Sequence, residues 1–378
     1  MIAALLTLNA LPKVGPIRLR RLLSRFKTPE TILHQSPNTL QTVSGIGPEV
    51  ASIIHHWRKH TNTEAELALC EQHNISILTP DSPLWPRYLS ESPDAPLLLY
   101  CKGEITAADQ HAIGIVGSRR CTHYGRSITR KFSQQLASAG YTIISGLARG
   151  IDTEAHLAAL DANGRTIAVL GSGLLELYPS ENKQLAERIA DGHGAIVSEF
   201  PLHRQPDKQT FPQRNRIVAN WSNALLVSEC PARSGSLITA GMANQNGRPV
   251  YAIPGPIDRP QSQGCHDLIR DGATLVTQPN QILQELHCPP LFPKEKKSNQ
   301  PLQSSEKLHS PPSPHPPSLN ELESRLYNEL NNQERTMDQL ADLAQAPIHL
   351  VSTTLLGLEM RGLVTQISGQ RYMRALNS

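Results

Sequence analysis

Between residues 112 and 276, short apolar runs alternate with stretches of ten or more residues that have helical spacing. Near-continuous apolar strands separated by helices are typical of a parallel sheet that is covered on both faces. The pattern therefore predicts an α/β domain, a Rossmann-like, doubly wound parallel sheet. The predicted strands are 112–117, 141–145, 166–171, 195–199, 224–229, 249–255 and 274–276.

The region before this domain has a different composition. At about 150 residues per domain, a chain of 378 residues has room for more than one domain. Residues 1–74 contain two Gly-Pro pairs, Gly15-Pro16 and Gly47-Pro48, each followed by apolar residues at helical spacing. We expect a small helical domain of the helix-hairpin-helix type, although ordinary turns between helices explain the pattern equally well. Residues 75–104 are rich in proline, and we expect an extended connector at the start of a domain spanning 75–288.

Two further parts follow the predicted sheet. Residues 289–317 contain nine of the 30 prolines, a composition that predicts a flexible linker. Residues 318–378 have the pattern of three helices and a two-strand wing that turns near Gly369, which predicts a winged-helix domain. This domain has five Lys and Arg against seven Asp and Glu, so its net charge is −2. Because a winged helix that reads duplex DNA neutralises several phosphates, we expect this one to serve protein contacts.

The sequence argues against several classes of protein. No apolar stretch approaches the ~18 residues of a membrane span, and the apolar opening lacks the basic residues and cleavage site of a signal peptide. The six cysteines are scattered without a C-x-x-C pair, which fits a reducing cytoplasm and neither disulfides nor a zinc site. His56 and His60 have no cysteine nearby and fit a solvated helix face. We expect no metal, no cofactor and no contact with a membrane.

The loops that leave the predicted strands have a composition that suits phosphate. Such loops collect at one edge of a parallel sheet, and here five of six are rich in Gly, Ser or Arg. Six basic residues and no acidic one lie between Gln110 and Ile151, in a chain whose net charge is only +3. Glycine-flanked amides, helix N-termini and arginines all favour an anion. The candidate phosphate-binding residues are Gly117, Ser118, Arg119, Ser145, Gly146, Arg149, Gly150, Ser234, Gly235 and Ser236.

Residues 208–216 add an aromatic ring to this edge. Phe211 lies close in sequence to three cations, Lys208, Arg214 and Arg216. A ring among cations favours single-stranded nucleic acid, because bases stack on the ring with little sequence preference. The chain lacks G-x-G-x-x-G after its first predicted strand and has no P-loop motif, which argues against a dinucleotide site or an ATPase. A core position for Phe211 explains its apolar side chain equally well.

An enzymatic alternative rests on residues 233–239, RSGSLIT, which resemble the phosphate-binding turn of nucleotide phosphoribohydrolases on Rossmann-like folds. Those enzymes need a carboxylate on the following helix, whereas no Asp or Glu occurs from Cys230 to Ile257. Asp152 and His156 lie four residues apart on one helix face, as a catalytic dyad or metal site would. An aspartate that satisfies free amides at a helix N-terminus gives the same pattern. We therefore expect no catalytic residue.

Seven segments occur in an order that resembles the DNA processing protein A family (DprA/Smf). They are GSRRCTHYG, SGLARGIDTEAH, GSGLLELYPSEN, SEFP, FPQRNRIVANWS, SGSLITAGMANQNGR and YAIPGPID, and the resemblance covers about residues 80–285. It implies a protein without known catalytic activity that binds and protects single-stranded DNA. It also implies loading of the RecA recombinase onto that DNA during natural transformation and homologous recombination, and a homodimer made through the Rossmann-like domain. The N-terminal helices resemble the family's sterile-alpha-motif-like domain, and residues 318–378 its optional winged-helix domain.

The resemblance also implies where the DNA pocket lies. It assigns contacts to Ser118 and Arg119, to the loop 145–152, and to Lys208 and Phe211. The segment Cys265-His266-Asp267 departs from the Gly-x-Asn that usually precedes Leu-Ile in the family. The resemblance therefore leaves open what this segment contributes to the dimer or the pocket.

Overall fold

The computed structural model describes residues 1–286, 321–330, 335–361, 363–367 and 371–374. They fall into two units, one within Met1–Glu295 and one within Lys296–Ser378, and each is described by itself. The predicted linker 289–317 lies outside the described residues.

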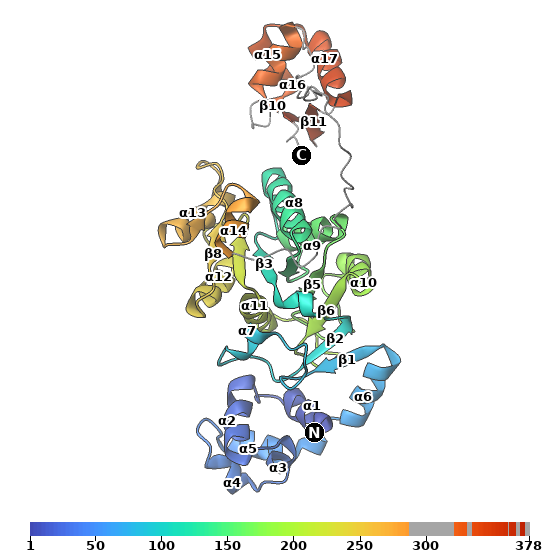
Figure 1. The fold of residues 1–378 in the computed structure, drawn as a ribbon, viewed down its shortest axis with the longest axis vertical. Coiled ribbons are helices and arrows are strands. Elements are labelled where there is room, and N and C mark those ends of the chain that lie inside the picture. The colour runs from blue at the N-terminus through green and yellow to red at the C-terminus, as the bar shows by residue number, and fades with distance from the viewer. Residues whose placement is uncertain (287–320, 331–334, 362, 368–370, 375–378) are drawn as a thin grey trace, which may run out of the picture. The chain divides into compact units, whose positions relative to one another are not determined.

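A nine-stranded sheet forms the centre of the first unit, in the order β1-β2-β6-β5-β4-β3-β7-β8-β9. Strands β1, β2, β3, β5, β6 and β8 of this sheet are labelled in Figure 1. The seven strands β3 to β9 all run parallel, which confirms the predicted doubly wound sheet and its seven strands. The strands are β1 (Ile75–Leu78), β2 (Leu99–Gly103), β3 (Ala112–Val116), β4 (Thr142–Ser145), β5 (Thr166–Val169), β6 (Gly194–Ser198), β7 (Ala224–Val227), β8 (Val250–Ala252) and β9 (Thr274–Leu275).

The two ends of the 75–104 segment are part of the sheet, so the expectation of an extended connector is wrong there. Strand β2 pairs antiparallel with β6, and β1 pairs antiparallel with β2. The sheet is therefore mixed, with an antiparallel edge on an otherwise parallel core. Between the two strands lie prolines and the one-turn helix α7 (Arg87–Ser90), which match the irregular composition.

Helices cover both faces of the sheet because successive side chains of each strand point to opposite faces. Ile113 and Ile115 of β3 belong to one core cluster, with α8, α9 and α14, whereas Ala112 and Val116 belong to another, with α11, α12 and α13. The helices of this part are α8 (His123–Ser138), α9 (Ile151–Asp161), α10 (Lys183–Ala190), α11 (Thr210–Trp221), α12 (Gly235–Gln245), α13 (Gln263–Arg270) and α14 (Pro279–Leu286), with 3-10 turns η2 (Ala107–Gln110), η3 (Ser180–Asn182) and η4 (Pro260–Ser262).

The chain direction across the sheet reverses between β3 and β7, which are neighbours. From β3 the chain winds outward through β4, β5 and β6, and from β7 it winds the other way through β8 and β9. Ligands of open α/β sheets bind at such a switch point, beyond the carboxyl ends of the strands. The loops after β3 and β7 are therefore the expected walls of the site.

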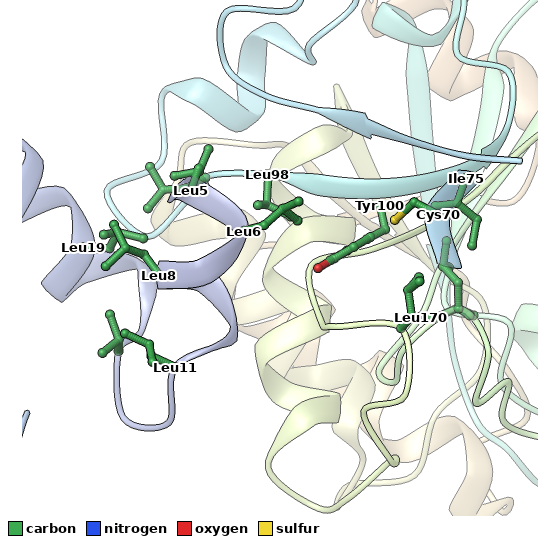
Figure 2. Packing of buried hydrophobic residues seen from close by; sticks show 14 of the residues in the cluster. Leu5, Leu6, Leu8, Leu11, Leu19, Cys70, Ile75, Leu98, Tyr100 and Leu170 are labelled. Atoms are coloured by element: carbon green, nitrogen blue, oxygen red, sulfur yellow. The ribbon is translucent and has the colours of Figure 1, made fainter. Parts of the chain in front are cut away.

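The N-terminal residues form six helices that pack against the sheet in a shared core. Leu6 of α1 lies in the same buried cluster as Leu98, Tyr100 and Leu170 (Figure 2). Both Gly-Pro pairs begin helices as predicted, with the glycine as N-cap and the proline in the first turn. The helices are α1 (Ile2–Ala10), α2 (Pro16–Phe26), α3 (Pro29–Leu33), α4 (Pro37–Gln41), α5 (Pro48–His55) and α6 (Thr63–Gln72), with a 3-10 turn η1 (Trp57–Lys59) between the last two.

The second unit is a winged helix, as predicted. Its core contains Leu326, Leu340, Leu355 and Tyr372, contributed by all three helices and the last strand. A short strand pairs with the predicted hairpin, whose turn near Gly369 lies outside the described residues. No helix in the described part of either unit is long and apolar enough to cross a membrane. The elements are α15 (Glu321–Glu329), β10 (Arg335–Thr336), α16 (Met337–Ala344), α17 (Ile348–Met360), β11 (Val364–Ile367) and β12 (Arg371–Arg374).

Candidate nucleic-acid interface

Two adjoining cavities lie at the carboxyl edge of the sheet, at the switch point. The larger, of about 510 Å³, is walled by the loops after β3 and β7. The smaller, of about 210 Å³, lies beside it toward the loops after β4 and β5. Arg119, Arg120, Ala148 and Arg214 line both cavities, so the two form one continuous site.

The larger cavity is lined by the N-terminus of α12. Ser234 caps this helix by accepting a hydrogen bond from the Ser236 amide at 3.2 Å, and the first turn contains no acidic residue. The Ser236 hydroxyl donates to the Gly117 carbonyl at 2.8 Å, which ties the helix to the loop after β3. Free amides and the helix dipole favour an anion here. Five predicted phosphate contacts, Gly117, Ser118, Ser234, Gly235 and Ser236, lie together in this lining.

The smaller cavity combines aromatic rings with cations. Phe211, in the first turn of α11, is half-buried, and its ring lines the cavity. The Arg119 guanidinium lies 4.8 Å from the Phe211 ring centroid, and the Tyr178 ring lies 5.9 Å from it at an interplanar angle of 51°. A Cβ at Gly171 would meet the Phe211 ring at 2.8 Å, so glycine is needed for the ring to sit at the end of β5. The ring is thus available to a ligand rather than enclosed in the core.

Arg214 forms the common floor of the two cavities. Its guanidinium donates to the carbonyls of Gly146 and Val169, at the ends of β4 and β5. Burial, with a smaller contribution from the nearby charge of Arg119 and opposed by that of Asp152, lowers the pKa of Arg214 to about 10, so it is charged at neutral pH. A Cβ at Gly146 would meet this guanidinium at 2.3 Å, which explains the glycine at that position. Arg214 therefore contributes a fixed positive charge while also holding two strand ends together.

Asp152 and His156 have separate structural partners and do not form a dyad in this structure. Asp152 Oδ2 accepts hydrogen bonds from the amides of Gly146 and Ala148 at 3.1 and 3.3 Å. His156 Nδ1 lies 2.6 Å from the Thr166 hydroxyl. Among the residues that the structure describes, no group of three or more His, Cys, Asp or Glu side chains could hold a metal ion. Asp152 organises the loop after β4, as the structural interpretation predicts.

Glu229, which precedes the predicted phosphate turn, is also committed elsewhere. Its carboxylate accepts hydrogen bonds from the Thr122 amide and hydroxyl at the start of α8. A Cβ at Gly125 would meet the same carboxylate at 2.6 Å, so the group is enclosed. Helix α12 therefore has no carboxylate of its own in its first turn, and the Glu229 carboxylate caps α8 instead. Asp152 lines the larger cavity, with its carboxylate bound to the amides of the loop after β4.

Four predicted DNA contacts lie outside the lining of the two cavities. Lys208 is exposed in the segment before α11. The Ser145 hydroxyl is buried and donates to the Ile115 carbonyl at 2.6 Å, so it joins β4 to β3. Gly150 supplies a backbone with φ of 77° before α9. Ser145 and Gly150 therefore shape the loop after β4, and neither lines the two cavities.

Arg216 is the fourth of these residues, and the prediction that it contacts DNA is wrong. It is only 6% exposed, and its guanidinium donates to the buried carboxylate of Glu199. Asp94 lies 3.9 Å from the same guanidinium, and the Glu199 carbonyl accepts from Asn9 of α1 at 2.8 Å. Arg216 thus belongs to a buried polar network between α11, the end of β6 and the N-terminal helices.

Arg149 lines the smaller cavity but already has an anionic partner. Its guanidinium pairs with Glu181, and both side chains are exposed.

The segment around Cys265 packs against neighbouring loops. The Cys265 Sγ is buried 4.0 Å from the Cys230 Sγ. His266 Nε2 lies 3.0 Å from the Gly255 carbonyl. Cys265 and His266, which depart from the family pattern, therefore pack against the loops after β7 and β8.

Two arginines and one tyrosine that line the site were not among the predicted contacts. Arg120 and Arg233 line the larger cavity, and Tyr178 lines the smaller one. Arg120 belongs to the basic stretch between Gln110 and Ile151, and Arg233 is the first residue of the predicted phosphate-binding turn 233–239, so the sequence contained a signal for both. Tyr178 follows β5, so its position in a loop at the carboxyl edge was the available signal.

Comparisons with known proteins agree with this architecture. The profile of the family described as DNA recombination-mediator protein A matches residues 76–287. A DprA winged-helix profile matches 310–370, and a SAM-like helix-hairpin-helix tandem matches 5–56.

Relatives match over most of the chain. Protein Smf of Synechocystis is 38% identical over 96% of both chains. The DNA processing protein DprA of Streptococcus pneumoniae is 46% identical over 53% of this chain and 71% of its own length. The crystal structure of that protein covers 75% of this chain and 96% of its own, with a TM-score of 0.65. A structure of DNA processing protein A from Helicobacter pylori, described by its single-stranded DNA binding mode, covers 56% of this chain and 95% of its own, with 29% identity and a TM-score of 0.51.

Proposed function

This chain belongs to the DNA recombination-mediator protein A family, and we propose that it binds single-stranded DNA across the two cavities at the carboxyl edge of its sheet. The observation that carries the proposal is the continuity of the two cavities through Arg119 and Arg214. One cavity offers amides and hydroxyls without a carboxylate on its helix, and the other offers aromatic rings. A single unpaired strand has both a phosphate and a free base to fill them.

The proposed contacts divide by chemistry. In the larger cavity the α12 N-terminus, Ser118 and Ser234 would receive a phosphate. In the smaller cavity the Phe211 ring would stack with a base, and Arg119 would neutralise the adjoining phosphate. A duplex has its bases paired and stacked internally, so it cannot place one on the ring without unpairing. The site therefore favours single strands over duplexes.

The test is an anisotropy titration of the full chain with a short labelled oligothymidylate and with a duplex of the same length. We expect tighter binding of the single strand and a steep fall in affinity as salt rises, because phosphate contacts release counterions. Equal affinity for the two DNAs at all salt concentrations would contradict the proposal. Release of free base from nucleoside monophosphates, above a control without protein, would instead favour the hydrolase alternative.

We further propose that the chain protects single-stranded DNA in the cytoplasm and helps to load the RecA recombinase onto it. Two observations support this proposal. The matching family profile is described as a recombination mediator, and two relatives of this chain are named as DNA processing proteins. The proposal places this activity in natural transformation and homologous recombination. Its test is strand exchange by RecA on DNA coated with a single-strand-binding protein, which should start sooner when the chain is added.

We also propose a homodimer made through the sheet domain. Strand β9 ends the sheet, and Leu275 on this strand is 45% exposed. An edge strand with an exposed apolar side chain is a surface that proteins cover by pairing or packing. We expect the chain to elute at the mass of a dimer in light-scattering chromatography, and Leu275→Glu to shift it toward the monomer. A monomeric wild-type chain at micromolar concentration would contradict this.

A further inference from the structure

Tyr178 is an aromatic residue of the smaller cavity to which neither composition nor resemblance gave a role. It lies between β5 and η3, at the same edge of the sheet as Phe211. The Tyr178 side chain is 41% exposed, whereas Phe211 is half-buried. A large aromatic surface left open beside cations is a feature of sites that stack bases.

The surroundings of Phe211 make Tyr178 the more accessible ring. The Arg119 guanidinium lies over the Phe211 ring, and Gly171, just after β5, lies so near that ring that an added Cβ would meet it at 2.8 Å. Tyr178 contacts Phe211 at a tilt of 51°, so the two rings are not parallel plates that could enclose one base between them. They instead present two separate faces at the rim of one cavity.

The segment that carries Tyr178 is held firmly on both sides. Asn182 Nδ2 donates to the Leu147 carbonyl at 2.8 Å and to the Thr153 hydroxyl at 2.9 Å, which ties the segment to the loop after β4. On the other side the Leu175 amide donates to the Leu202 carbonyl at 3.1 Å, after β6. A binding group on a segment fixed in this way loses little freedom when it contacts a ligand.

We propose that Tyr178 is a second base-stacking residue, so that Phe211 and Tyr178 hold two different unpaired bases of one strand. This inference rests on the proposed single-stranded DNA binding at the same edge. It adds a ligand requirement, because a strand must present at least two unpaired nucleotides to fill the rim. The phenolic hydroxyl has no part in it, so the ring alone is sufficient.

The experiment measures the affinity of the full chain for the shortest oligothymidylate that it binds. Because one stacked base contributes about 1–3 kcal/mol, Tyr178→Ala should weaken binding about five-fold or more, while Tyr178→Phe should bind like the wild type. The control is Tyr88→Ala, which removes a tyrosine that also lies against an arginine, Arg248, but lines neither cavity. Thermal unfolding followed by circular dichroism checks that each variant is folded.

A double variant separates stacking from mere support of Phe211. If the rings hold different bases, the losses of Tyr178→Ala and Phe211→Ala should multiply in the double variant. If the double variant binds the oligothymidylate as tightly as Phe211→Ala alone, Tyr178 only supports the position of the Phe211 ring. That result would overturn the inference. Wild-type affinity of Tyr178→Ala alongside weakened Arg119→Ala would also overturn it while leaving the proposed function standing. If Tyr178→Ala, Phe211→Ala and Arg119→Ala all bound with wild-type affinity, both this inference and the proposed function would be wrong.

Discussion

The guanidinium of Arg119 lies 4.8 Å from the centroid of the Phe211 ring, so the first loop of the parallel sheet meets the first turn of α11 above the smaller cavity. A cation over a ring is held by the ring's quadrupole and remains able to pair with an anion. The two residues are 92 positions apart in sequence (211 minus 119), and the fold alone brings them together. This pair is the centre of the proposed DNA site.

Replacing Arg119 by Ala should lower the salt dependence of single-strand binding as well as the affinity. One phosphate contact on a single strand contributes about 0.7 to the slope of log affinity against log salt, so the slope should fall by about that amount. Anisotropy titrations at four or more salt concentrations measure it. The control is Arg130→Ala, which removes an equal charge from the exposed side of α8, where Arg130 pairs with Glu154. An unchanged salt slope for Arg119→Ala would contradict the proposed contact between Arg119 and a phosphate.

Replacing Phe211 by Ala should weaken binding by about 1–3 kcal/mol with little change in salt slope, because stacking releases no counterions. Phe211→Tyr keeps the ring and should bind within about two-fold of the wild type. Titration with an oligothymidylate and with an abasic oligonucleotide of equal length distinguishes base stacking from phosphate contacts. If the abasic strand loses as much affinity on Phe211→Ala as the thymidylate does, the ring acts on something other than a base.

The seven parallel strands were predictable because each is a near-continuous apolar run, as a strand buried on both faces must be. Strands β1 and β2 were missed because they are short runs within a proline-rich segment, and their pairing with β6 is a tertiary contact. The error at Arg216 has a geometric cause. Residues two apart on a helix point about 200° apart, so Arg214 faces the cavities while Arg216 faces Glu199.

Glu181 should act as a competitor for the charge of Arg149. Because the two side chains pair at the rim of the smaller cavity, Glu181→Gln should free the guanidinium for phosphate while keeping a hydrogen-bonding group of the same shape. We expect higher affinity for single-stranded DNA at low salt and no difference at high salt, where exposed charges are screened. Glu187→Gln, exposed on α10, makes the same change in net charge and serves as the control. Equal gains in both variants would show a general charge effect.

The buried His156 should make the stability of the first unit sensitive to acid. Burial, with a smaller contribution from Arg214, lowers the pKa of His156 to about 3 from the ordinary value of 6.5. Between these values the unfolded chain binds a proton that the folded chain does not, so the free energy of unfolding falls as pH falls. The fall from this residue is about 1.4 kcal/mol per pH unit within that window, and the contribution is constant above pH 6.5.

Urea unfolding at pH 7, 6, 5 and 4 measures this effect by comparing the wild type with His156→Gln. The variant lacks the titrating group, so its stability relative to the wild type should rise steadily as the pH is lowered. The absolute stability of the variant at pH 7 does not enter the comparison. A difference between the two proteins that stays constant from pH 7 to pH 4 would show that His156 titrates normally.

The winged helix should add little to DNA binding. The helix α17 contains no Lys or Arg, and Arg361, which follows it, pairs with Glu323. Leu350 and Leu356 on α17 are 46% and 58% exposed, which suits an apolar protein contact better than a phosphate backbone. We expect a chain truncated after residue 287 to bind single strands and duplexes within about two-fold of the full chain. A large loss of duplex affinity on truncation would contradict this.

The N-terminal helices share one buried cluster with the sheet, from Leu6 of α1 to Leu170 beyond β5 (Figure 2). Asn9 and the Arg216–Glu199 pair extend this junction with polar contacts. The N-terminal helices are therefore packed firmly against the sheet and are not joined to it by a hinge. A protein bound to these helices would therefore be held at a fixed distance from any strand bound at the proposed site, because the packed leucines join the helices to the sheet.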